Sequence, residues 1–341
     1  MKAIRNYIDK IKPNFEHGAK WGSLHSTFEA FESFLFVSKK VTSGGVHIKD
    51  SIELKRTMFI VVLALVPATL FGMYNVGLQH YLATGEASTF FGNFWFGFLK
   101  VLPIIIVSYV VGLGIEFMFA QLRKHEVNEG FLVSGLLIPL IMPVDAPLWM
   151  VAVSTAFAVV IGKEVFGGTG MNVFNPALLA RAFMFFAYAP FISGDKVWVA
   201  GLKAGDGIID GFSGATPLTQ AADAVVNNTP LAFDFSWNWV IGTMPGCIGE
   251  TSFIAIMLGA ILLLLTGIAS WRVMLSVFAG GYLMGVIFNL IGANAYMDMP
   301  AYYHLFLGGF AFGAVFMATD PVTGSQTNTG KWIYGSLIGA L

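Results

Sequence analysis

Residues 57–78 read Thr57-Met-Phe-Ile-Val-Val-Leu-Ala-Leu-Val-Pro-Ala-Thr-Leu-Phe-Gly-Met-Tyr-Asn-Val-Gly-Leu78, without a single charged side chain. An α-helix needs about 20 consecutive apolar residues to cross the hydrocarbon core of a bilayer. We therefore expect this stretch to span a membrane. Other runs long enough to cross lie at 97–120, 148–166, 251–270, 273–294 and 301–319.

The composition agrees with a membrane protein. Mean hydropathy is +0.72, and only 11% of the residues are charged, whereas a soluble protein would have about 25%. Two shorter apolar runs, at 130–142 and 177–192, contain Pro139 and Arg181. We expect them to be tilted, broken or buried in protein, because irregular backbone at membrane depth survives only away from lipid. The sequence thus predicts an all-α polytopic membrane protein with about eight or nine transmembrane or partial helices.

Positive charge is concentrated at the N-terminus, where residues 1–56 hold ten of the 19 lysines and arginines. The positive-inside rule predicts that this segment is a cytoplasmic N-terminal arm. Residues 57–341 then form the transmembrane domain, with the loop at 193–250 on the external side. No apolar h-region precedes the first long run, so we expect no cleaved signal peptide. The last apolar run, 332–341, has half the length that a crossing needs, and we expect a C-terminally truncated sequence.

Charge and cysteine count exclude several functions. A formal net charge of −1 gives no electrostatic basis for binding nucleic acid. The single cysteine, Cys247, can form no internal disulfide and cannot supply the set of thiolates that holds an iron–sulfur cluster. The polar loop 121–130 is either a solvated hairpin or a site for partners or ions, and its His125 lacks the companions that zinc requires.

Two stretches resemble each other, Gly130-Phe-Leu-Val-Ser-Gly-Leu-Leu-Ile-Pro-Leu-Ile-Met-Pro-Val-Asp145 and Gly309-Phe-Ala-Phe-Gly-Ala-Val-Phe-Met-Ala-Thr-Asp-Pro321. Each is apolar and ends in a Pro/Asp break. In the predicted topology the first runs outward and the second inward, as in an inverted repeat, whose sites lie at the repeat interface. The alternative is that glycine-rich membrane helices simply look alike.

The polar segment Asp210-Gly-Phe-Ser-Gly-Ala-Thr-Pro-Leu-Thr219 lies between apolar runs, where packing gives no reason for it. The hydroxyl of Thr216 can form a phosphoester. We expect Gly214 and Ala215 to leave the backbone open to a modifying enzyme, and Pro217 to favour an extended conformation at Thr216. We interpret the segment as a covalent flavin attachment site.

A second polar interruption, Phe166-Gly-Gly-Thr-Gly-Met-Asn-Val-Phe-Asn-Pro176, is rich in glycine. The amides of Asn172 and Asn175 offer donors and acceptors suited to the edge of a flat heterocycle. The alternative is an ordinary turn in which Asn175 and Pro176 start a helix.

Charged residues beside the apolar runs are further candidates. Lys163, Glu164 and Arg181 suggest a polar site, because each would cost about 2.5–3.5 kcal/mol at the centre of a bilayer. Asp320 precedes an oxygen-rich segment that suits a hard cation such as Na+, although helix capping explains the same residues. Glu116 interrupts an apolar run and is a candidate for function, unless it snorkels to the nearby membrane surface.

These motifs resemble those of the B-subunit family of the Na+-translocating NADH:quinone reductase, and the resemblance covers essentially the whole chain. It rests on the segments His47–Arg56, Arg123–Phe131, Lys163–Gly170, Phe174–Ala177, Asp210–Thr216 and Phe316–Pro321. The D subunit of the related Rnf complex shares the Ser-Gly-Ala-Thr-Pro loop. It is less similar in the segment 123–131 and lacks so long an N-terminal arm.

The resemblance implies that a flavin transferase joins FMN to Thr216 by a phosphoester, on the external side of the membrane. The attachment motif would include Asp210, Ser213, Gly214 and Ala215. Thr216 would then be a phosphorylated threonine carrying a covalent flavin.

The resemblance also implies a non-covalent riboflavin near Asn172 and Asn175. It implies a site for ubiquinone or menaquinone that involves the N-terminal arm and the helix around Gly112. Family members often carry adjacent glycines where this chain has Gly112-Leu-Gly114, so the shape of the quinone pocket is expected to differ. Asp320 is the candidate ligand for the transported Na+.

The implied function is a membrane electron-relay subunit of a Na+-pumping NADH:ubiquinone oxidoreductase. Its partners would be the other subunits of a six-subunit complex, among them an FMN-bearing subunit and an NADH-oxidising subunit. The complex would lie in the lipid of a bacterial inner membrane. One alternative is an Rnf-type D subunit, which works with ferredoxin and NAD; another is a channel or transporter without flavin.

Overall fold

The computed structural model describes residues 2–15, 28, 32, 44–46, 54–123, 130–205, 207–231 and 233–341. Of the predicted N-terminal arm it includes helix α1 (Lys2–Ile11) and a 3-10 turn at Lys12–Phe15. Most of the remaining arm, and the loop at 124–129 with His125, lie outside the described residues. The quinone and partner roles expected of these segments therefore stay predictions.

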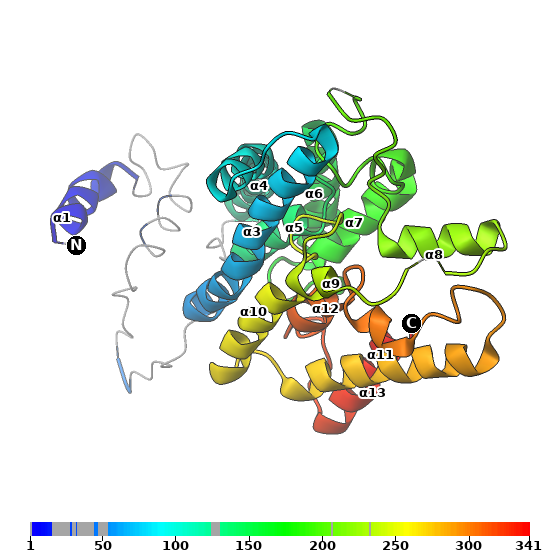
Figure 1. Ribbon diagram of the computed structural model, residues 1–341. Helices are drawn as coiled ribbons and strands as arrows, with labels where there is room; N and C mark the ends of the chain where they lie inside the picture. Colours follow the sequence, from blue (N-terminus) through cyan, green and yellow to red (C-terminus); the bar gives the residue numbers. More distant parts are fainter. Residues whose placement is uncertain are drawn as a thin grey trace.

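The described part of the chain is helical and contains no strand. Long apolar helices able to cross a membrane are α3 (Leu54–Thr84), α4 (Phe90–Arg123), α6 (Leu148–Gly162) with its 3-10 extension to Phe166, and α11 (Trp271–Ile291). Shorter helices complete the structure, with α5 between α3 and α7 in the view of Figure 1: α5 (Phe131–Leu140), α7 (Pro176–Ala187), α8 (Pro217–Val226), α9 (Trp237–Ile241), α10 (Phe253–Leu265), α12 (Phe310–Phe312) and α13 (Asn328–Ala340). The predicted fold class, an all-α polytopic membrane protein, is confirmed.

Helices α3 and α4 form a closely packed antiparallel pair. Their 31 and 34 residues give lengths of about 47 and 51 Å, more than the hydrocarbon core of about 30 Å. Gly77 lies against the backbone of Asn93, and Gly97 lies against the backbone of Met73. Small residues at such contacts let membrane helices approach closely. Elsewhere on α3, exposed side chains recur at helical spacing and suit contact with lipid: Phe59, Leu63, Val66 and Leu70.

One predicted membrane crossing, 301–319, is wrong. The segment instead forms a 3-10 turn (Ala301–Leu305), the single turn α12, and a wide π-helical turn (Gly313–Met317). Gly308 has a φ of +63°, which glycine adopts easily and which interrupts a helix. In the wide turn the Ala318 N–H donates to the carbonyl five residues earlier at 2.8 Å. Such irregular backbone fits a position inside the protein rather than in lipid.

The two short apolar runs form short helices, as predicted. Helices α5 and α7 have 10 and 12 residues, or about 15 and 18 Å, and neither crosses a bilayer core alone. Helix α10 has only 13 residues, although the run 251–270 was expected to cross. It begins after Ser252, whose hydroxyl accepts the Ala255 N–H at 3.2 Å, and it ends before Gly267 at φ +70°. Ends of α5, α7 and α10 meet around one pocket.

Candidate functional site

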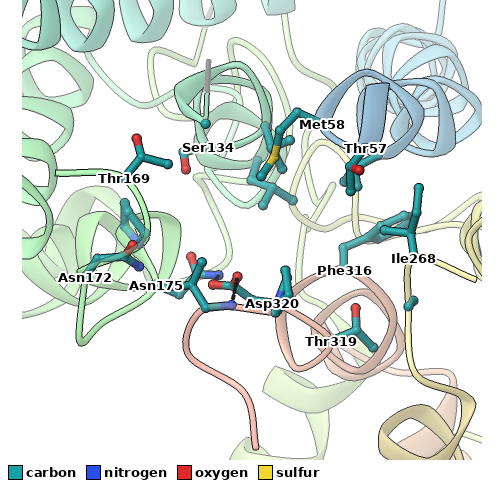
Figure 2. Close-up of a pocket in the computed structure, with 18 of the residues that line it drawn as sticks. Thr57, Met58, Ser134, Thr169, Asn172, Asn175, Ile268, Phe316, Thr319 and Asp320 are labelled. Atoms are coloured by element: carbon teal, nitrogen blue, oxygen red, sulfur yellow. Dashed lines mark hydrogen bonds between the residues drawn. The ribbon is translucent and has the colours of Figure 1, made fainter. Parts of the chain in front are cut away.

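A pocket of about 790 Å³, its open mouth included, lies among the first turns of α3, α5 and α7 and the end of α10 (Figure 2). Residues 319–322, which follow the π turn, also line it. Both look-alike stretches, 130–145 and 309–321, contribute to the wall. A site between the two stretches is what an inverted repeat would give, and the repeat itself stays a prediction.

Asn172, Asn175 and Asp320, predicted for riboflavin and Na+, meet in this pocket. Asn175 Nδ2 donates to Asp320 Oδ2 at 3.4 Å (Figure 2). Asn175 Oδ1 accepts the N–H of Ala177 at 2.9 Å and so caps α7, which confirms the helix-starting interpretation of Asn175. The cap also holds the side chain at the pocket wall. Asn172 Nδ2 donates to the Phe174 carbonyl at 3.1 Å.

The carboxylate of Asp320 is surrounded by hydrogen-bond donors. Besides Asn175, it accepts the Val322 N–H at 3.0 Å and the Thr323 hydroxyl at 3.0 Å. These are turn contacts, whereas a cation needs oxygen ligands. The described residues contain no group of three or more His, Cys, Asp or Glu that could hold a metal ion. The Na+ role of Asp320 therefore stays a prediction.

Two ion pairs lie beside the pocket. Lys163 donates to the carboxylate of Glu116, and the two side chains are only 3% and 4% exposed. Arg123 donates through Nη1 to Glu164 Oε2 at 3.2 Å and through Nη2 to the Glu164 carbonyl at 2.7 Å. Glu116 therefore does not snorkel to the surface, and pairing offsets the cost of burying its charge. Sequence reasoning missed both pairs because the partners are 47 and 41 residues apart.

Arg181 lies in a separate cluster. Its guanidinium donates to the carbonyl of Ile141, just after α5, and to Cys247 Sγ at 3.0 Å. Glu250 lies close enough to attract Arg181 electrostatically. The expectation of one polar site built from Lys163, Glu164 and Arg181 is therefore wrong, because the three charges belong to two clusters. Sequence reasoning also missed Glu250, which directly precedes an apolar run and gave no periodic signal.

Thr216 is the N-cap of α8. Its backbone is extended, with φ −72° and ψ 159°, as Pro217 predicts. Its hydroxyl accepts the Thr219 N–H at 3.2 Å and lies 3.0 Å from the Thr219 hydroxyl. The side chain is partly exposed. In Figure 1, α8 lies at the right-hand edge of the molecule, away from the N-terminal end of α3 that borders the pocket.

The rest of the predicted attachment motif is more constrained than expected. Gly214 is buried, and a Cβ there would lie 3.0 Å from the Leu202 side chain and would collide with a backbone carbonyl. The expectation that Gly214 keeps the backbone open is therefore wrong, since tight packing requires the glycine. Ala215 is partly exposed and donates its N–H to Ser213 Oγ at 3.2 Å. Ser213 and Asp210 are exposed.

Comparison with known proteins assigns the chain to a family. The sequence pattern of the NQR2, RnfD, RnfE family matches residues 41–341. The chain belongs to this family. It is 45% identical to the B subunit of the Na(+)-translocating NADH-quinone reductase of Chromohalobacter salexigens, over 99% of this chain and 86% of that relative. The corresponding B subunits of Ectopseudomonas mendocina and Azotobacter vinelandii are 45% and 44% identical, each over 99% of this chain and 88% of the relative.

Membership of the NQR2, RnfD, RnfE family confirms the resemblance that the motifs indicated. Gly112, the residue expected near a quinone, has a packing role in this structure. The fully buried ring of Phe131 lies directly against it and leaves no room for a side chain. The Lys163 ammonium lies 6.0 Å from the centre of the same ring. Gly114, by contrast, has open space beside it. The quinone role of Gly112 stays a prediction.

Proposed function

We propose that this chain is the membrane electron-relay subunit of a Na+-translocating NADH:quinone reductase. It carries FMN on Thr216 and a riboflavin beside Asn172 and Asn175, and it passes electrons to ubiquinone or menaquinone while Na+ is exported. The relatives named as the B subunit of that enzyme, aligned over nearly the whole chain, support the role. When bound, the flavins supply the electron chemistry, and the residues of the chain fix their position, orientation and surroundings.

The position of Thr216 is the observation that carries the proposal. A hydroxyl at the N-cap of the ten-residue helix α8 places a phosphoester where backbone N–H groups and the helix dipole favour negative charge. Partial exposure of the residue supports access by a flavin transferase. Tight packing of Gly214 holds the preceding backbone in place, which supports a fixed attachment point.

The pocket at Asn175 suits a flat, largely apolar heterocycle with a polar chain. Met58 and Phe316 supply apolar wall, and Ser134 and Thr169 supply hydroxyls. The carbonyl oxygen of Asn172 has no partner among the described residues and is available to accept a hydrogen bond from the ligand. These groups would bind and orient riboflavin and keep water from its ring.

The proposed setting is a bacterial inner membrane, with the N-terminus cytoplasmic and Thr216 on the external side. The sequence contains no GxGxxG dinucleotide fingerprint, so NADH oxidation is assigned to a partner subunit and electrons arrive through an FMN-bearing partner. Export of Na+ against 100 mV costs about 2.3 kcal/mol per ion, and electron transfer must release at least that much.

In-gel flavin fluorescence of the denatured chain, purified from flavinylating cells, tests the proposal. The wild-type band should fluoresce, and Thr216→Ala should be dark. Thr216→Asn is the sharper variant, because asparagine is a good helix N-cap but has no hydroxyl to esterify. It should fold like the wild type and also be dark. Thr219→Ala, which removes the neighbouring hydroxyl, should remain fluorescent. A dark wild-type band would refute the proposal.

The family description also includes Rnf subunits, which makes an Rnf-type D subunit the second candidate. Such a subunit would carry the same covalent flavin but would work with ferredoxin and NAD. Quinone reduction by the purified complex separates the two functions. Fluorescence at Thr216 without quinone reduction would favour the Rnf-type function.

A further inference from the structure

Two described charged side chains line the pocket, Lys163 and Asp320. We infer that the ion pair between Lys163 and Glu116 makes this pocket select an uncharged flavin over its phosphorylated forms. The inference rests on the proposed function, because it concerns the flavin expected beside Asn172 and Asn175. It assigns to Glu116 a role in ligand specificity.

Phosphorylated flavins require a partner for their charge. A phosphate monoester carries a charge of about −1.5 to −2 at neutral pH. Burying such a group is unfavourable unless a cation or a set of N–H donors meets it. Selection between riboflavin and FMN therefore depends on whether the pocket offers a free cation or a free helix N-terminus.

Lys163 is not free to meet a phosphate. Its ammonium donates to the Glu116 carboxylate, and both side chains are buried, at 3% and 4% exposure. If the lysine moved away from Glu116, the glutamate would remain as an unpaired buried charge, which is unfavourable. Arg123, which belongs to the same charge cluster among the described residues, is likewise engaged by the side chain and the carbonyl of Glu164.

The N-terminus of α7, a position suited to phosphate, is also occupied. Asn175 Oδ1 accepts the N–H groups of Ala177 and Leu178, at 2.9 and 3.5 Å. The Asp320 carboxylate is hydrogen-bonded to the same asparagine and would repel a phosphate. The remaining polar groups are neutral, and the hydroxyls of Ser134 and Thr169 match an unphosphorylated ribityl chain.

Releasing the lysine should change the selectivity. In Glu116→Gln, Lys163 loses its anion and becomes available to a ligand phosphate. A hydrogen bond between Lys163 and the phosphate involves charged groups and should strengthen FMN binding by more than about tenfold. The ratio of bound FMN to riboflavin should therefore rise at least about tenfold. The double variant with Glu116→Gln and Lys163→Gln has no cation to release. It should keep the wild-type ratio and is the matched control.

The measurement is the non-covalent flavin released by acid from the natively purified complex, separated by chromatography into riboflavin and FMN. Covalent FMN stays on the precipitated chain and does not interfere. If Glu116→Gln does not assemble, Glu116→Asp provides the test. Its shorter side chain weakens the pair while keeping the charge, and the ratio should rise, but by less than in Glu116→Gln.

A raised ratio in the single variant, absent in the double variant, supports the inference. An unchanged ratio in an assembled single variant overturns it while leaving riboflavin binding intact. A wild-type complex that releases no flavin at all refutes the proposed function of the pocket and this inference with it.

Discussion

Asn175 and Asp320 are hydrogen-bonded at 3.4 Å although 145 residues separate them in the sequence. Asn175 caps α7, and Asp320 follows the irregular segment that ends in the π turn. The bond thus joins two walls of the pocket. Asn175 therefore both starts helix α7 and links two walls of the pocket.

Replacing Asn175 with alanine should therefore affect stability and ligand together. Loss of the cap should cost about 1 kcal/mol, and loss of the bond to Asp320 should lower the amount of retained riboflavin. Thermal unfolding and acid-released flavin measure the two effects. Thr327→Ala is the matched control, because Thr327 caps α13 through the Gly330 N–H at 3.1 Å and lies outside the pocket. Equal flavin loss in both variants would contradict the prediction.

The buried pair of Lys163 and Glu116 should show strong non-additivity. Lys163→Met alone leaves Glu116 as an unpaired buried charge, and Glu116→Gln alone leaves Lys163 as one. Each single substitution should therefore destabilise the protein by about 3–5 kcal/mol. The variant that combines Lys163→Met with Glu116→Gln should be more stable than either single variant. Equilibrium unfolding in detergent tests this. Lys12→Met, which removes a partly exposed lysine from its pair with Glu32, should cost less than about 1 kcal/mol.

Gly112→Ala should be destabilising because its Cβ would enter the ring of Phe131. Overpacking of this kind costs roughly 1–3 kcal/mol. Gly114→Ala, on the same helix with open space beside it, should be neutral or stabilising, since alanine favours helix by about 1 kcal/mol. Adding Phe131→Leu should rescue Gly112→Ala. Thermal unfolding distinguishes these outcomes, and quinone reduction that falls while stability is rescued would support a quinone role for Gly112.

Asp145 should make stability depend on pH. It lies between α5 and α6, outside the membrane-spanning helices, and burial raises the pKa of its carboxyl above the ordinary 3.8. The Gly201 N–H, at 3.1 Å, and the nearby Lys100 and Lys203 oppose the shift. Because the folded-state pKa is the higher one, this contribution to stability is present below the ordinary pKa. It is lost as the pH rises through the raised pKa.

Asp145→Asn should remove this loss. The Tm of the variant should rise relative to the wild type as the pH increases from about 4 to about 7. Asp210→Asn, at an exposed position, should run parallel to the wild type over the same range. If the difference in Tm between Asp145→Asn and the wild type stayed constant over this pH range, burial of this carboxyl would not affect folding.

Local sequence patterns predicted the elements that depend on local physics. The run 57–78 became α3, and the pair Asn175 and Pro176 became the start of α7, because apolar length and capping are properties of neighbouring residues. The prediction of a membrane-crossing helix at 301–319 was wrong because hydrophobic composition does not reveal the left-handed backbone conformation at Gly308.

Local sequence patterns did not predict contacts between residues that are far apart in the chain. The sequence allows Glu116 to snorkel, but its neutralising lysine lies 47 residues further along the chain. Gly214 was expected to leave the backbone open to an enzyme, yet the Leu202 side chain packs against it. In each case the outcome depended on a contact between distant segments, which a single sequence does not specify.

The π turn at 313–317 has a consequence for the geometry around Asp320. A π turn contains one residue more than the α-helical turn that it replaces. Deleting a single residue there would restore regular hydrogen bonding and rotate everything downstream by about 100°, swinging the carboxylate away from Asn175. The number of residues in this segment, rather than their chemistry, therefore determines whether the Asp320 carboxylate points toward Asn175.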